Sequence, residues 1–165
     1  MRLSFVQAAE PDAAAIASLR VATAASLTEQ FGRGHWSGAA TVRGVVAGMH
    51  DAKIWIARRG TSVVGTFRLS TVKPWAIDSS RFTPRTLPLY LTDMAVLPDQ
   101  QRHGIGRRCL AKAIELAAAW PADAIRLDAY DAAAGAGTFY EKCEFTEVGR
   151  ASHRGVSLVY YERLI

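Results

Sequence analysis

The chain has 165 residues, of which 50% are hydrophobic and 21% are charged, a composition typical of one globular domain with a single core. Lys and Arg outnumber Asp and Glu by 20 to 15, so the formal net charge is +5. This excess suits an anionic ligand such as a phosphate. No Lys/Arg-rich block with interleaved aromatic residues occurs, however, which argues against a nucleic-acid partner.

Cysteine usage and hydropathy narrow the class of protein further. Cys109 and Cys143 are too far apart for a CxxC motif, so we expect neither a disulfide framework nor a metal site. The N-terminal segment lacks the apolar core of a signal peptide, and no stretch approaches the ~20 apolar residues needed to cross a bilayer. The sequence therefore predicts one domain over residues 1–165, located in the cytoplasm and not in a membrane. A homodimeric state is left open.

Hydrophobic periodicity predicts the elements of the N-terminal half. A strand at 3–7 is followed by an Ala-rich helix after Pro11, by a glycine-punctuated loop at 31–38 and by a second helix at 39–49. Two alternating runs, 53–58 and 63–70, are separated by Arg59-Gly60-Thr61. That spacing predicts an antiparallel hairpin.

The C-terminal half begins with an irregular segment at 71–88, which holds three prolines and two aromatic residues. Loops of this length within a domain are often functional. The elements predicted after it are a strand at 89–96, a helix from Gly104 that ends before Pro121, a strand at 125–129, a short helix at 136–142 and a strand at 156–161. An early hairpin and a later strand–helix–strand unit predict a mixed α/β sheet with helices on both faces.

The most informative segment runs from Tyr90 to Arg108, where a strand leads through a loop into a helix. A helix start leaves backbone N–H groups unpaired, and the helix dipole adds partial positive charge there. Gly104 and Gly106 let a phosphate approach that backbone without a Cβ in the way. Nearby donors and charges come from Gln101, Arg102, His103, Arg107 and Arg108. The two glycines alone would fit a core helix cap equally well.

Other phosphate-binding and hydrolytic motifs do not match. Cys109 occupies the place of the third glycine of GxGxxG, and GxxxxGK[ST], HExxH and GxSxG are all missing from the chain. These absences argue against a dinucleotide dehydrogenase, a P-loop NTPase, a zinc protease and a serine hydrolase.

Two signatures resemble the GNAT superfamily of N-acetyltransferases. The segment 101–106, QRHGIG, matches the family's cofactor motif Gln/Arg-x-x-Gly-x-Gly/Ala, and the segment 139–145, FYEKCEF, is similar to its Phe-Tyr-Glu-Lys-x-Gly-Phe signature. Two positions depart from the family's pattern. Ala133 stands where an Asn often contacts the pantetheine arm, and Glu144 replaces the helix-ending Gly. The resemblance implies a mostly antiparallel central sheet of six to seven strands with helices on both faces.

For function, the resemblance implies transfer of an acetyl group from acetyl-CoA, the co-substrate, to a primary amine of a small molecule or peptide, by direct attack in a ternary complex. The N–H groups of residues 102–107 would bind the pyrophosphate. The strand at 94–96 would pair with the pantetheine amides, and an N–H near Met94 or Ala95 would support the developing oxyanion. The implied cofactor-binding residues are Met94, Ala95, Val96, Gln101, Arg102, His103, Gly104, Ile105, Gly106 and Arg107.

Three residues are candidates for proton transfer. Tyr140 matches the family's general acid, although a core aromatic would give the same pattern. Asp93 and Asp128 interrupt apolar strands, where a carboxylate is costly unless it is paired or used. Each is therefore a candidate base or a salt-bridged structural residue, and water could also take the proton. Alternation places Asp93 on the face opposite its neighbours unless a bulge resets it.

Acceptor choice is expected to come from two loops, one holding His35 and Trp36 and the other holding Trp75 and Phe82. Aromatic side chains there would wall an apolar or ring-bearing amine, or would simply pack the loops down. The alternative function, which Ala133 keeps open, is a catalytically idle acyl-CoA-binding sensor module.

Overall fold

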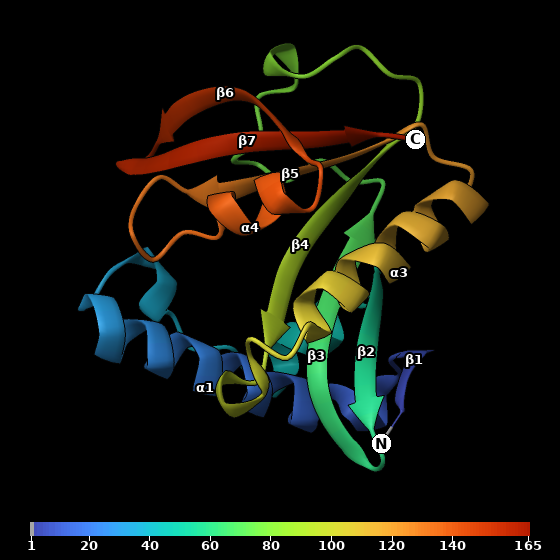
Figure 1. Cartoon of the computed structure of the whole chain (residues 1–165), viewed down its shortest axis with the longest axis vertical. Helices are drawn as coiled ribbons and strands as arrows, with labels where there is room; N and C mark the ends of the chain where they lie inside the picture. Colours follow the sequence, from blue (N-terminus) through green and yellow to red (C-terminus); the bar gives the residue numbers. More distant parts are fainter. Residues whose placement is uncertain (1) are drawn as a thin grey trace.

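A computed structural model describes residues 2–165. Within them, seven strands form one sheet in the order β1-β2-β3-β4-β5-β7-β6, and β4 and β5 are the parallel neighbours in an otherwise antiparallel sheet (Figure 1). The strands are β1 (Leu3–Gln7), β2 (Lys53–Arg59), β3 (Ser62–Ser70), β4 (Pro88–Val96), β5 (Ala124–Tyr130), β6 (Thr146–His153) and β7 (Val156–Leu164).

Helices cover both faces of this sheet. On one face lie α1 (Ala13–Phe31) and α2 (Val42–Gly48), and on the other lie α3 (Ile105–Ala119) and α4 (Gly137–Lys142). Successive side chains of a strand point to opposite faces of the sheet, so one strand can hold helices on both faces. In β2, Ile56 packs against α1 and α2, while its neighbour Ala57 packs against α3. The expected mixed α/β fold, mostly antiparallel with helices on both faces, is confirmed.

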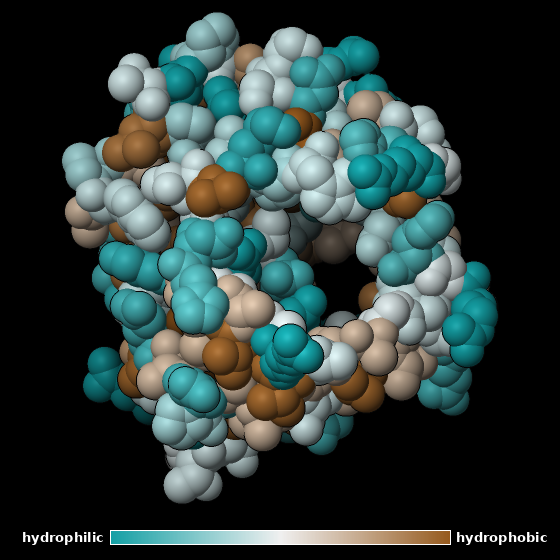
Figure 2. All heavy atoms as spheres, turned by 180° about the vertical axis from the view of Figure 1, so that it is seen from behind, coloured by the Kyte–Doolittle hydropathy of each residue, from teal (hydrophilic) through white to brown (hydrophobic). Residues whose placement is uncertain are grey.

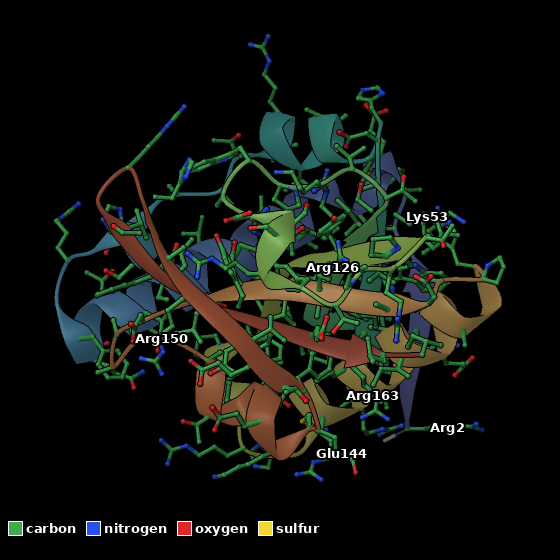
Figure 3. The ribbon with its side chains drawn as sticks, turned by 90° about the horizontal axis from the view of Figure 1, so that it is seen from above. Arg2, Lys53, Arg126, Glu144, Arg150 and Arg163 are labelled. Atoms are coloured by element: carbon green, nitrogen blue, oxygen red, sulfur yellow. The ribbon has the colours of Figure 1, made fainter. Side chains whose placement is uncertain are left out.

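The irregular segment between β3 and β4 covers the α1 face where no helix does. Ile77 and Phe82 are buried there against β4 and β7. The segment is fixed by Arg126, which is only 5% exposed and donates from Nη2 to the carbonyl of Thr83 (2.8 Å), and by Glu162, which accepts from the Thr83 N–H (3.1 Å). Figure 3 shows Arg126 beneath this segment. A long loop is thus held by buried polar groups that find partners in its backbone.

The structure differs from the sequence-based expectation at two elements. The second helix is shorter than 39–49 because Thr41 caps it, accepting a hydrogen bond from the Gly44 N–H (3.0 Å). The strand β6 was not predicted. Its sequence, TEVGRASH, is largely polar, because β6 is an edge strand that pairs with β7 alone and carries a bulge between Glu147 and Gly149. No helix in residues 2–165 is both long enough and apolar enough to span a bilayer.

The sheet forks at its parallel pair. β4 and β5 are joined only from Pro88–Tyr90 to Ala124–Arg126 and then separate, β4 running on to Val96 and β5 to Tyr130. At the fork point, Arg126 donates from Nη1 to the Tyr90 hydroxyl (3.3 Å). Beyond it, the edge of β4 that faces β5 has no partner strand in the described chain, so its backbone groups are free to bind something else.

Candidate active site

A cavity of about 500 Å³ occupies the fork. Seen from the side opposite to Figure 1, a deep opening hollows the surface where the two arms of the sheet separate (Figure 2). The lining residues come from α1, the end of β4, the loop before α3, the start of α3 and the β5–α4 segment: Thr23, Leu27, Met94, Ala95, Val96, Gln101, Arg102, Gly104, Gly106, Arg107, Ala134, Ala136, Phe139, Tyr140 and Lys142.

One wall of the cavity is the N-terminus of α3. Gly104 precedes the helix with φ +78°, and no side chain of the described residues caps the free N–H groups of the first turn. A Cβ at Gly104 would point into open space, whereas one at Gly106 would lie 3.3 Å from the Phe139 ring. Arg102 is also left-handed (φ 64°). Successive N–H groups in such a loop, with Arg107 beside them, form an anion-binding concavity.

The end of β4 carries a bulge. Thr92 pairs with Arg68 and Ala95 pairs with Thr66, so Asp93 and Met94 together oppose the single residue of β3 that remains. Asp93 has φ 53°. The sequence left open whether a bulge changes the face of the sheet on which Asp93 lies, and this is such a bulge. It interrupts the alternation, and Met94, Ala95 and Val96 line the cavity in succession.

Tyr140 closes the inner end of the cavity. Its side chain is 8% exposed, and its hydroxyl lies 3.9 Å from the Met94 Sδ atom, across from β4. Burial, followed by the negative charge of Asp128, raises the pKa of Tyr140 above its ordinary value. The phenol therefore stays protonated at neutral pH and can donate a proton or a hydrogen bond.

The two candidate bases differ in their partners. Asp93 accepts a hydrogen bond from Arg20 of α1 in an ion pair of 2.9 Å. Within residues 2–165, the Asp128 carboxylate has neither an ion pair nor a hydrogen bond, and it is half-buried. Burial, and then the charge of Asp93, raises the pKa of Asp128. A raised pKa makes a carboxylate a stronger base, so Asp128 fits that role better than Asp93.

The segment between α1 and α2 reaches across to β5. Tyr130 donates from its hydroxyl to the carbonyl of His35 (3.2 Å), and the Trp36 ring meets the Tyr130 ring edge-on at 5.9 Å. Trp36 is held in turn by donating from Nε1 to the Gly32 carbonyl (2.9 Å). Tyr130 lies two residues after Asp128 on β5, and alternate residues of a strand share one face, so this aromatic pair lies on the same face of the sheet as the Asp128 carboxylate.

The other loop expected to contact the acceptor lies away from the fork, and its part in acceptor choice stays a prediction. Phe82 is buried in the hydrophobic cluster that the segment between β3 and β4 forms with β4 and β7. Trp75 stacks on His153 (4.5 Å) and under Arg154 (5.0 Å), at the tip of the β6–β7 hairpin. Neither residue lines the cavity in the fork, and neither do Trp36 and Tyr130.

A model of the acetyltransferase (GNAT) family matches residues 10–145, which is most of the chain and includes every residue that lines the cavity, but not β1, β6 and β7. The chain belongs to the GNAT family of acetyltransferases. No curated protein matches its sequence.

Solved GNAT structures resemble this one over nearly their whole length. The PaiA N-acetyltransferase of Thermoplasma acidophilum, solved with coenzyme A, is 12% identical with a TM-score of 0.74 and 100% of each chain covered. The Salmonella typhimurium protein yncA, solved with acetyl-CoA, is 14% identical with a TM-score of 0.72, covering 99% of this chain and 94% of its own. The ribosomal-protein-S18-alanine N-acetyltransferase of Escherichia coli is 16% identical with a TM-score of 0.73 and the same coverage. At these identities the likeness concerns the fold.

In this GNAT domain the residues expected to bind the cofactor are mostly together. All ten except His103 and Ile105 line the cavity. His103 is exposed outside it, and the Ile105 side chain lies in the core with 2% exposure, so only its backbone can face a ligand. Sequence reasoning missed Thr23 and Leu27 of α1. Both lie on one face of that helix, but nothing in the sequence indicates that this face meets the fork. Within residues 2–165, no group of His, Cys, Asp and Glu is placed to hold a metal ion.

Proposed function

We propose that the chain is a single acetyltransferase domain that transfers the acetyl group of acetyl-CoA to a primary amine of a small molecule or peptide. Both substrates bind together, and the amine attacks the thioester directly. One observation carries the proposal: a single cavity joins the open start of α3, the unpaired end of β4 and the Tyr140 hydroxyl. The bound coenzyme A and acetyl-CoA in the two similar structures support it.

The residues present fit acetyl-CoA, which would supply an acetyl group activated as a thioester. The N–H groups of residues 102–107 are unpaired donors for its pyrophosphate, with the charges of Arg107 and Lys142 beside them. The free edge of β4 at Met94–Val96 offers backbone groups to amides of the pantetheine arm, as an added strand would. A β4 N–H at Met94 or Ala95 is the donor for the carbonyl oxygen that becomes negative during attack.

Asp128 takes the proton of the acceptor amine. A primary amine is protonated at neutral pH and cannot attack until that proton is removed. Asp128 lies on the arm of β5 beyond the fork and has neither an ion pair nor a hydrogen bond within residues 2–165, and its raised pKa brings it closer to that of the amine. Asp128 passes this first proton on to water. The amine then forms the new C–N bond as the C–S bond breaks, and its second proton leaves to water.

Tyr140 donates a proton to the departing thiolate. A phenol with a raised pKa is a weaker acid than usual, which by itself disfavours the step. The thiolate, however, is released into the same buried environment, where its own pKa is also raised. The difference between the two groups therefore stays near its value in water, and the transfer remains feasible.

The acceptor carries an apolar or ring-bearing group next to its amine. Trp36 and Tyr130 form an edge-to-face pair beside Asp128, and such a pair favours contact with flat or apolar groups. The Escherichia coli structure belongs to an enzyme named for a protein's alanine, so peptides with a free N-terminus belong among the acceptors tested.

The experiment is a thiol-release assay with acetyl-CoA over a panel of aromatic amines, alkyl amines, aminoglycosides and peptides with free N-termini. We expect amine-dependent release of CoA that Asp128→Asn lowers by about 10²-fold or more. Calorimetric binding of acetyl-CoA without release for any acceptor would instead identify an idle acyl-CoA sensor. Failure to bind acetyl-CoA at all would refute both.

A further inference from the structure

An ion pair links α1 to the bulge of β4. Arg20 Nη2 lies 2.9 Å from Asp93 Oδ1, and the two side chains are 31% and 40% exposed. Arg20 shares one face of α1 with Thr23 and Leu27, three and seven residues further on, and both of those line the cavity. Arg20 and Asp93 do not line the cavity themselves, but each lies next to a residue that does, Thr23 on α1 and Met94 on β4.

The backbone of Asp93, the carboxylate partner in this ion pair, has an unfavourable conformation. Its φ of 53° is rare for a residue with a Cβ, and such outliers cluster at functional sites. An exposed ion pair adds little to folding stability. The arrangement is thus better explained by what it does to neighbouring charges and to the bulge than by what it adds to the fold.

The neighbouring charge that matters is Asp128. The groups that interact with its carboxylate are Asp93 from β4, Tyr130 from its own strand and Tyr140 from α4. Asp93 is the one carboxylate among these three groups, and Arg20 is its ion-pair partner. Arg20 is therefore placed to offset part of the negative charge that acts on Asp128.

We infer that Arg20 is a positioning residue of the acetyltransferase site: its ion pair with Asp93 holds the bulge of β4 against α1 and takes that carboxylate out of competition, so that Asp128 alone receives the acceptor's proton. The inference rests on the proposed function. Arg20 touches neither substrate in this role and acts through Asp93. Asp93, one of the two candidate bases, thereby becomes part of the support for the other.

The test is to measure the ionisation of Asp128 by carboxyl ¹³C NMR, together with the acid limb of the kcat/KM profile. Arg20→Met leaves Asp93 uncompensated, so both should move to higher pH by about half a unit to one unit. Asp93→Asn should move both to lower pH. The double variant changes the net charge by zero and should return near wild type, and Arg20→Lys should restore the wild-type limb.

A merely structural role gives a different pattern. It would lower kcat for both single variants at every pH, with no opposite shifts and with additive losses in the double variant. The matched control is Arg58→Met, which removes another ion pair of similar exposure at the start of α1, Arg58–Asp12 (2.6 Å). It should leave the acid limb in place. Unchanged Asp128 ionisation in Arg20→Met and Asp93→Asn would overturn the inference.

The outcomes also separate this inference from the proposed function. The NMR titration needs no turnover, so it decides the influence of Arg20 on Asp128 whether or not an acceptor is found. Loss of the acid limb in Asp128→Asn, with a limb that Arg20→Met does not move, would keep Asp128 as the base and refute Arg20. An active Asp128→Asn enzyme with an unchanged limb would refute both roles.

Discussion

The two halves of the proposed site are built in different ways. The proposed cofactor side is one short stretch of chain, residues 94–107, and would work through backbone N–H groups and glycines. The proposed acceptor side is assembled from α1, the loop after it and β5, through side chains outside the lining of the cavity, such as Arg20, Trp36 and Tyr130. The first side can be recognised as a motif because its parts are contiguous. The second exists only after folding.

The difference predicts how each side responds to substitution. Backbone donors are unaffected by most side-chain changes, so the cofactor side should fail only where a Cβ or a strained φ intrudes. The acceptor side depends on individual side chains, and single truncations there should change acceptor preference or pH dependence while leaving acetyl-CoA binding intact. Tyr140 lies where the two sides meet.

The largest effect is expected for Tyr140→Phe, which removes only the hydroxyl and keeps the ring packed against Phe139 and Phe145. General acid catalysis is worth about 10²–10⁴-fold, so kcat should fall by that factor with little change in acetyl-CoA affinity. Because the pKa of Tyr140 is raised, its own ionisation should not appear as a basic limb below about pH 10. Full kcat in the variant would show that Tyr140 is a core aromatic and that solvent protonates the thiolate.

The substitution Gly104→Val tests the cofactor side. A branched side chain at φ +78° would both strain the loop and fill the open space in front of the α3 N-terminus. Loss of one or two phosphate hydrogen bonds, about 1–3 kcal/mol, corresponds to about 10- to 100-fold weaker acetyl-CoA binding by calorimetry.

The chain supplies a matched control for that variant. Gly155, in the β6–β7 turn, has φ +79° and equally open space around its Cβ position. Gly155→Val should therefore lower Tm by a similar few degrees while acetyl-CoA binding stays unchanged. Equal binding by both variants would mean that the anion site is not at the start of α3.

Particular residues explain how much could be predicted from the sequence. Gly104 and Gly106 predicted the loop-to-helix turn because a local motif needs only local residues. Strand β6 was missed because an edge strand with polar residues lacks the alternation that marks a buried one. Asp93 and Asp128 were equivalent in sequence. In the structure they differ because Arg20 pairs with Asp93 and not with Asp128. Arg20 lies 73 positions before Asp93 in the chain, and no pattern in a single sequence indicates such a distant pair.

Substitutions at two tryptophans test which loop contacts the acceptor. Trp36→Ala removes the ring that packs on Tyr130 beside Asp128. An aromatic contact of this kind is worth about 0.5–1.5 kcal/mol, so KM for ring-bearing acceptors should rise about 2- to 10-fold, with KM for acetyl-CoA nearly constant. Trp75→Ala is the control, because that ring stacks on the β6–β7 hairpin. If Trp75→Ala instead alters acceptor preference, the acceptor enters from the other loop.

The smallest effect concerns the end of α4, where Glu144 replaces the family's glycine. Glu144 has φ 67°, its N–H donates to the Glu141 carbonyl (3.1 Å), and the next N–H, of Phe145, donates to the Tyr140 carbonyl (3.1 Å). These two bonds are a Schellman ending, which favours glycine at this position. The Glu144–Arg163 ion pair beside it (2.9 Å; Figure 3) is exposed and adds little.

Glu144→Gly should therefore relieve the left-handed strain and raise Tm by about 1–3 °C, with kcat and acetyl-CoA affinity unchanged, because Glu144 does not line the cavity in the fork. Glu144→Ala separates the two contributions, since it loses the same ion pair but keeps a Cβ at positive φ. Its Tm should stay at or slightly below that of the wild type. If alanine and glycine raise Tm equally, the gain comes from removing the carboxylate and not from the backbone, and the departure from the family's glycine carries no strain.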